Sequence, residues 1–157
     1  MDRITSDQAA SLYTQLLGAW NRRNAVDFAA LFTQDGNTVG FDGSPLDGQA
    51  AIASTLHDIF TSHSTAAYVA KIREVRGLGS GVTLLRAVVG MVPPGQTELN
   101  PAVNALQSVV IVEEGGQLRI SLLHNTPAAF HGRPHLAEQL TEELTGVLRS
   151  GQIVQAG

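Results

Sequence analysis

The chain contains no cysteine among its 157 residues. Disulfide bonds, thiolate nucleophiles and cysteine-ligated zinc are therefore excluded. Charged residues are also scarce, at 15% of the sequence, where soluble domains average about a quarter. We expect this shortage of surface charge to reflect a surface that is hidden against a partner subunit.

A basic cluster is missing as well. The chain has 10 basic and 14 acidic residues, for a net charge of −4. Arg22 and Arg23 form only a pair, and Lys71, Arg73 and Arg76 alternate with apolar residues. Nucleic-acid binding needs clustered cations to neutralise phosphates. We therefore expect no nucleic-acid partner.

Long apolar runs are absent too. The longest, around residues 108–112, is far too short to span a bilayer. The first residues, MDRITSDQAA, lack the apolar core of a signal peptide. We expect no membrane partner and a cytoplasmic location.

The most informative segment that is present covers residues 19–36, AWNRRNAVDFAALFTQDG. Trp20, Phe28, Leu31 and Phe32 recur at helical spacing, so they can build one apolar wall. The polar residues 21–24 interrupt that spacing and mark a bend between two helices. The segment predicts two short helices that share one apolar wall.

Hydrophobic periodicity predicts an α+β fold with a single domain over residues 1–150 and a flexible tail over residues 151–157. The expected helices cover residues 5–22, 26–32, 49–61 and 134–149, and a short strand covers residues 38–41. Four further strands, joined by short turns, are expected at residues 66–76, 81–92, 102–113 and 117–125. Such connections predict a curled antiparallel sheet.

The predicted strands carry apolar residues on both faces. An antiparallel sheet with one face in water alternates apolar with polar residues. Both faces should therefore be covered. Because the N-terminal helices cover only one face well, we expect a homodimer through the other sheet face.

The segment at residues 19–36, together with PLDGQAAIASTLHDIF, resembles the nuclear-transport-factor-2-like superfamily in its SnoaL-like branch. Asn125-Thr126-Pro127 and Gly132-Arg133-Pro134, near the end of the chain, resemble the SgcJ/EcaC-type oxidoreductase-labelled subgroup of enediyne polyketide gene clusters. The resemblance covers nearly the whole chain. It implies a cone-shaped, cystatin-like half-barrel with an extra C-terminal helix and an apolar pocket.

The resemblance implies a small apolar or polyketide-like ligand, and two functions remain open. One is cofactor-free acid-base catalysis of cyclisation, isomerisation or dehydration in polyketide-type biosynthesis. The other is a non-catalytic dimeric protein that binds or shields a hydrophobic intermediate. The oxidoreductase label has no support in the sequence, because there is no GxGxxG, no flavin signature and no metal-ligand set. We expect no cofactor and no metal.

Two residues are the catalytic candidates. His124 ends the last predicted strand in phase with Leu118 and Ile120, and a histidine can act as a general base near neutral pH. It could equally be a hydrogen-bonded histidine at a strand end or dimer seam. Asp35 could abstract a proton at a pocket rim, although the sequence Gln-Asp-Gly favours a turn.

The other candidate site residues are aromatic or polar groups within apolar patterns. Arg86, if buried, requires a partner, which could be an acidic ligand, Glu74 or a facing subunit. Asn125 could bind a substrate carbonyl or cap the backbone before Pro127. The predicted pocket-lining residues are Trp20, Phe32, Phe41, His57, Phe60, Tyr68, Arg86, Asn104 and Asn125.

Overall fold

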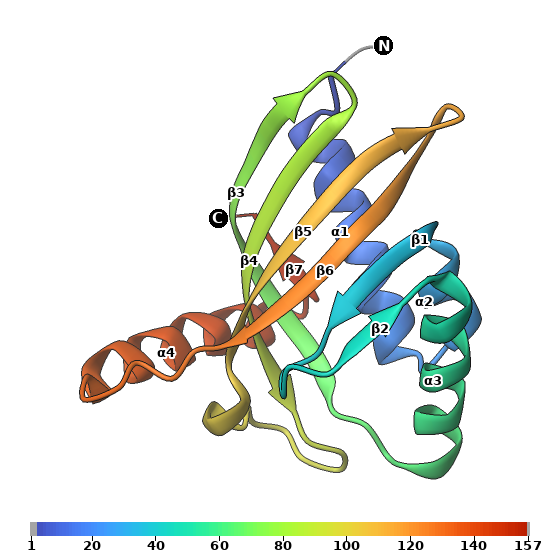
Figure 1. The fold of residues 1–157 in the computed structure, drawn as a ribbon. Coiled ribbons are helices and arrows are strands. Elements are labelled where there is room, and N and C mark those ends of the chain that lie inside the picture. Colours follow the sequence, from blue (N-terminus) through green and yellow to red (C-terminus); the bar gives the residue numbers. More distant parts are fainter. Residues whose placement is uncertain (1–2, 157) are drawn as a thin grey trace.

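The computed structural model describes residues 3–156, in which helices pack against a seven-stranded sheet (Figure 1). The elements are α1 (Ser6–Asn21), α2 (Ala25–Ala30), β1 (Phe32–Val39), β2 (Pro45–Asp47), α3 (Gln49–Ser62), β3 (Ala67–Gly79), β4 (Val82–Val92), the 3₁₀ helix η1 (Pro101–Val103), β5 (Ala105–Glu114), β6 (Gln117–Pro127), α4 (Pro134–Ser150) and β7 (Val154–Gln155).

Local capping signals set the ends of the helices. Thr5 caps α1, where its hydroxyl accepts from the Gln8 backbone N–H and the Gln8 side chain accepts from the Thr5 N–H. Asn24 caps α2 in a similar way. Gly151 ends α4 in a left-handed conformation (φ 80°) that glycine adopts without a steric penalty.

The sheet is curled and unclosed, with the strand order β2-β1-β6-β5-β4-β3-β7 (Figure 1). Strands β3 to β6 form the predicted antiparallel meander. Two pairings join strands of the same direction, β1 with β6 and β3 with β7. The α+β expectation is confirmed, and the parallel pairings add β1 and β7 to the two edges of the meander.

The first strand is longer than predicted, and the second helix is shorter. We expected a helix over residues 26–32 and a strand over residues 38–41, but β1 already begins at Phe32. Phe32 pairs with Ile120, whose backbone N–H donates to the Leu31 carbonyl. Pairing with β6 therefore outweighs the local helical pattern. At Gly36 a Cβ would lie 2.9 Å from the Ile120 carbonyl oxygen, so this close approach requires glycine.

Helices α1, α2 and α3 cover the inner face of the sheet. Their buried side chains and the inward residues of β3 to β6 form one hydrophobic core. Leu16, Leu17 and Ile52 are fully buried in it. This face contains the candidate site.

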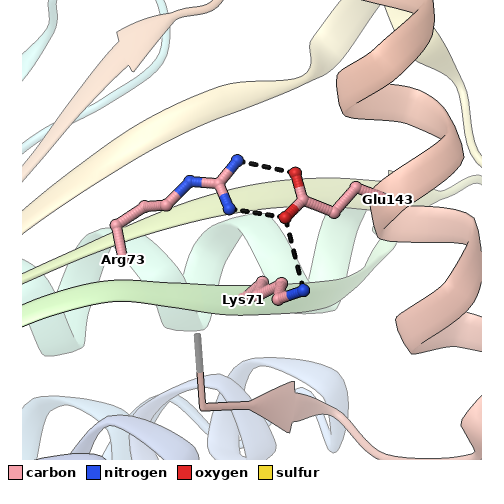
Figure 2. Close-up of polar contacts among 3 residues, drawn as sticks. All are labelled: Lys71, Arg73 and Glu143. Carbon is pink, nitrogen blue, oxygen red and sulfur yellow. Dashed lines mark hydrogen bonds and ion pairs between the residues drawn. The ribbon is translucent and has the colours of Figure 1, made fainter.

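Helix α4 covers part of the outer sheet face. Its residues Leu140, Leu144 and Val147 pack against Val69 and Val88. Glu143 on α4 binds Arg73 of β3 through two contacts of 2.5 and 2.6 Å, and Lys71 lies 3.4 Å away (Figure 2). The second apolar face is therefore covered in part by the chain itself.

The expected flexible tail contains a short strand. Val154 and Gln155 form β7 and pair with Ala70 and Lys71. The Ala70 N–H donates to the Ile153 carbonyl over 2.8 Å, and Ile153 packs on the core. Residue 157 lies outside the described residues. Within residues 151–156, the chain pairs through backbone hydrogen bonds with the edge of β3 that β4 leaves open. A side-chain pattern does not predict such bonds.

Candidate functional site

A cavity of about 470 Å³ lies between the helices and the inner face of the sheet. Its wall is mostly apolar, with side chains from α1, α2 and α3 opposite side chains from β1, β3, β4, β5 and β6. The lining residues are Leu17, Trp20, Phe28, Thr38, Gly40, Phe41, Asp42, Ser44, Leu46, Ile52, Thr55, Leu56, Ile59, Tyr68, Met91, Gln107, Leu123 and Asn125.

One side of the cavity is an aromatic wall. The ring of Trp20 lies 5.1 Å from Phe60, 5.4 Å from Tyr68 and 6.1 Å from Phe28, measured between centroids. The indole N–H donates to the Ala66 carbonyl over 2.9 Å, which fixes the ring. Aromatic side chains fixed in this way offer a rigid apolar surface to a ligand.

Tyr68 also carries a hydroxyl, and together with Gln107 and Asn125 it forms the polar part of the lining, which we call the polar floor. Tyr13 is fully buried behind it, and its hydroxyl donates to the Gln107 side-chain oxygen over 2.5 Å. The Gln107 amide nitrogen donates to the Asn125 side-chain oxygen over 2.8 Å. The Asn125 amide nitrogen donates to the Val39 carbonyl over 2.9 Å. The floor is thus one chain of hydrogen bonds from α1 to the end of β1.

Both phenols of this region stay neutral at physiological pH. Burial raises the pKa of Tyr68 to about 12, although the nearby Gln107 side chain lowers it in part. Burial, with a smaller contribution from Tyr68, raises the pKa of Tyr13 well above its ordinary value. Both groups are therefore hydroxyl donors rather than bases.

The rim of the cavity is the loop between β1 and β2. Phe41 is 41% exposed there, and the Asp42 carboxylate accepts the Ser44 backbone N–H over 2.9 Å. This backbone bond, with the Ser44 hydroxyl, lowers the pKa of Asp42. Asp42 is therefore ionised at neutral pH, at the solvent-exposed mouth of the cavity.

The structure brings four of the predicted lining residues together around this cavity: Trp20, Phe41, Tyr68 and Asn125. Phe60 packs against Trp20 and Phe32 packs against Phe28, but both are buried outside the set that lines the cavity. His57 is exposed on α3, next to a separate shallow hollow.

The remaining predicted lining residues lie on the outer side of the sheet. Arg86 is exposed and pairs with Glu74 at 3.4 Å, which is one of the partners considered from the sequence. Asn104 is buried against α4, where its amide donates to Thr141 over 2.9 Å. Neither residue lines the cavity.

The two candidate catalytic residues also lie outside the lining set. His124 is exposed and stands opposite Ser108 on β5. A register shift in β6 places Ser121 as an extra residue, so Leu118 and Ile120 share the inner face with Leu123 rather than with His124. The phase inferred for His124 from simple alternation is therefore wrong. Asp35 is exposed and accepts the Thr33 hydroxyl over 2.9 Å.

Sequence reasoning missed several lining residues. The available signal for Gln107 is a polar residue within an apolar strand pattern, because a buried amide requires partners. Around Asp42 the sequence Asp-Gly-Ser-Pro indicates a turn and gives no sign of a site. No pattern singled out Tyr13, which occupies an ordinary helical core position. Among residues 3–156, no group of three or more histidine, aspartate or glutamate side chains could hold a metal ion.

A larger groove of about 1060 Å³ runs between α4, the start of β3 and residues 96–101. Many of its lining side chains are polar, and Glu98 and Arg149 bring charges of both signs. Within the part of the chain that the structure covers, no helix has the length and apolar character needed to cross a bilayer.

No protein-family model matches the chain, and no curated protein matches its sequence. Solved structures show its fold. A domain of unknown function with a cystatin-like fold from Nostoc punctiforme has a TM-score of 0.75 at 23% identity, covering 92% of this chain and 94% of that one. An NTF2-like protein of unknown function from Shewanella oneidensis has a TM-score of 0.61 at 12% identity, with 77% and 98% covered.

A ketosteroid isomerase-like protein from Erwinia carotovora has a TM-score of 0.59 at 16% identity, with 79% of this chain and 98% of that one covered. These identities show the fold alone. The chain has a cystatin-like, NTF2-like fold, as the sequence resemblance implied.

Proposed function

We propose that this protein binds a small, largely apolar molecule in the cavity between its helices and its sheet, without converting it. The observation that carries this proposal is the composition of the cavity wall, which combines aromatic and aliphatic side chains with a floor of neutral amides and a phenol. Small-molecule sites typically have this make-up of an apolar wall and few polar groups.

The volume of about 470 Å³ suits a ligand of two to four fused rings or a folded polyene. The sequence resemblance supports an intermediate of polyketide-type biosynthesis as the ligand class. Binding that removes such a molecule from water would shield it from side reactions. The exposed positions of His124 and Asp35 give acid-base catalysis by these two residues no geometric support.

A larger side chain that fills the cavity tests this proposal. Thr55 on α3 lines it, whereas the adjacent Ser54 is exposed on the same helix. Thr55→Phe should weaken binding of the neutral probe N-phenylnaphthylamine at least tenfold in equilibrium dialysis, and Ser54→Phe should leave it unchanged. Equal affinities in both variants would contradict the proposal. Native mass spectrometry of the purified protein would then identify any ligand carried from the cell.

A second candidate function is cofactor-free proton transfer, and one observation favours it. The Asp42 carboxylate lines the mouth of the cavity and is ionised at neutral pH. A general base at the rim, facing hydroxyl and amide donors that could stabilise an enolate, is a possible isomerase arrangement. The ketosteroid isomerase-like neighbour supports this candidate. We expect Asp42→Asn to abolish turnover of a bound ketone and to leave binding of the ketone unchanged. Turnover is measured as exchange of the ketone's protons in deuterated water.

We also propose a homodimer through the part of the outer sheet face that α4 leaves open. Leu84, Val110 and Leu122 lie in register there and are half-buried in the single chain. Val110→Glu should shift the mass measured by light scattering at micromolar concentration from dimer to monomer. Leu78→Glu, at a position already 54% exposed, serves as the control. A monomeric wild-type protein would count against the dimer.

A further inference from the structure

The direction of every hydrogen bond in the polar floor follows from one backbone group. The Val39 carbonyl can only accept, so Asn125 must turn its amide nitrogen toward it. The Asn125 oxygen then faces Gln107, which must offer its own amide nitrogen. The Gln107 oxygen is left to face Tyr13, which must donate its hydroxyl hydrogen. The orientations of both amides are therefore fixed without reference to a ligand.

This hydrogen-bond network leaves some donor hydrogens without an acceptor. Each amide nitrogen carries two hydrogens, and the second hydrogen of Asn125 has no acceptor among the described residues. The Gln107 side chain lies close enough to the Tyr68 hydroxyl to lower its pKa, as an amide N–H that donates to a phenol oxygen does. The hydroxyl hydrogen of Tyr68 is then left without an acceptor among the described residues. Because the pKa of Tyr68 is about 12, that hydrogen is present at every physiological pH.

Each amide oxygen of the polar floor likewise retains one unused lone pair. The Gln107 oxygen and the Asn125 oxygen each accept one hydrogen bond from within the network. A buried N–H or O–H without a partner is rarer in proteins than an oxygen with one lone pair unused. The floor therefore presents a surplus of donors to the cavity.

The other residues that line the cavity do not offset these unpaired donors. The hydroxyls of Thr38, Ser44 and Thr55 can rotate to donate or to accept, so they set no direction. Among the lining residues within 3–156 there is no lysine, arginine or histidine, and the single carboxylate, on Asp42, lies at the exposed rim. A negatively charged ligand group would find no counter-charge there, and its burial would be costly.

We propose that the cavity selects neutral ligands that carry a hydrogen-bond-accepting oxygen, such as the carbonyl of a ketone, aldehyde or lactone, placed against Tyr68 and Asn125. This inference rests on the proposed binding function and adds the polarity of the group that is recognised. A ligand whose only polar group is an ammonium would leave the floor donors unpaired and would bring further donors against them.

A matched set of ligands tests the proposal. Acetylnaphthalene and isopropenylnaphthalene, substituted at the same ring carbon, differ only in a carbonyl oxygen replaced by a methylidene group. Their binding to the wild-type protein and to Tyr68→Phe, measured by calorimetry, forms a double-mutant cycle. We expect the ketone to bind the wild-type protein about thirtyfold more tightly than the hydrocarbon, since a hydrogen bond contributes about 1 kcal/mol and two donors are available.

In Tyr68→Phe the affinity for the ketone should fall about fivefold, while the affinity for the hydrocarbon should stay the same. The hydrocarbon thus controls for any change in cavity shape. If wild-type protein binds both ligands equally, the donor floor is overturned while the binding function stands. If it binds neither, the proposed function fails and the inference fails with it. A naphthylethylammonium ligand that binds as tightly as the ketone would also overturn the inference.

Discussion

The hydroxyl of Tyr13 on α1 donates a hydrogen bond to the side chain of Gln107 on β5, although the two residues are 94 positions apart in the sequence. Both side chains are almost completely buried. The bond joins the first helix to the central strands of the sheet and, through Asn125, to the end of β1. The hydrogen bond at the α1 end of the polar floor is therefore also a long-range structural contact.

Removing either end of this contact should destabilise the fold. We expect Tyr13→Phe to cost about 1–2 kcal/mol, because it leaves the Gln107 oxygen without its buried donor. Gln107→Leu should cost about 2–3 kcal/mol, because the Tyr13 hydroxyl and the Asn125 oxygen both lose a partner. In urea denaturation the double variant should lose less stability than the sum of the two single variants. Strict additivity would show that the two groups are not coupled.

The tyrosines should resist titration. The chain has two tyrosines, Tyr13 and Tyr68, and burial raises the pKa of both. Because the folded-state pKa values lie above the unfolded value of about 10, the stability that depends on neutral phenols is present below that value. It is lost as pH rises through the folded-state values. Near-ultraviolet absorbance should show phenolate only as circular dichroism shows unfolding. A titration midpoint near the ordinary tyrosine value in folded protein would contradict the burial.

The ion cluster in Figure 2 should stabilise the docking of α4 in a pH-dependent way. Hydrogen bonds from Arg73, with a smaller effect of Lys71, lower the pKa of Glu143 below its ordinary value of 4.5. The stabilisation is therefore present above that value and is lost as pH falls through the folded-state pKa. The cluster is partly exposed, so Glu143→Gln should cost only about 0.5–1 kcal/mol at neutral pH.

The adjacent Glu142 is exposed on the same helix and provides the control as Glu142→Gln. Its urea denaturation curve should match that of the wild-type protein at neutral pH. The difference between Glu143→Gln and wild-type protein should shrink in acid. A difference that stays constant with pH would show that packing, rather than charge, accounts for the effect.

Gly90 of β4 sets how closely α4 approaches the sheet. A Cβ there would lie 3.1 Å from methyl carbons of Leu144 and Leu99 and 3.2 Å from the Asn104 oxygen. Gly90→Ala should therefore cost about 1–3 kcal/mol by overpacking, measured by thermal unfolding. Gly77→Ala on β3 is the control, because a Cβ there meets no atom within 4 Å. Equal stability of both variants would indicate that α4 can shift without penalty.

Much of the fold could be predicted because periodicity and turn residues act locally. Helices α1, α3 and α4 and the four-stranded meander lie within a few residues of their predicted bounds. Two features could not be read in this way, the extension of β1 to Phe32 and the pairing of β7 with β3. Both depend on backbone hydrogen bonds to distant strands, for which side-chain patterns carry no signal.

The candidate site was harder to predict because it depends on the phase of single strands. One extra residue at Ser121 reverses which side chains of β6 face inward, so Asn125 lines the cavity and His124 does not. Helical spacing pointed to Trp20 and Phe28 of the aromatic wall, whereas Phe60 and Tyr68 come from α3 and β3. The hydrogen-bonded floor could not, because Tyr13, Gln107 and Asn125 come from three separate elements.

Trp20 has a further consequence, because it is the single tryptophan of the chain. Its indole lies in the cavity wall, with its N–H held by the Ala66 carbonyl. The intrinsic fluorescence of the protein therefore originates at the cavity. Water in the cavity and a bound ligand would give different emission maxima of Trp20. The tryptophan fluorescence therefore reports whether a ligand occupies the cavity.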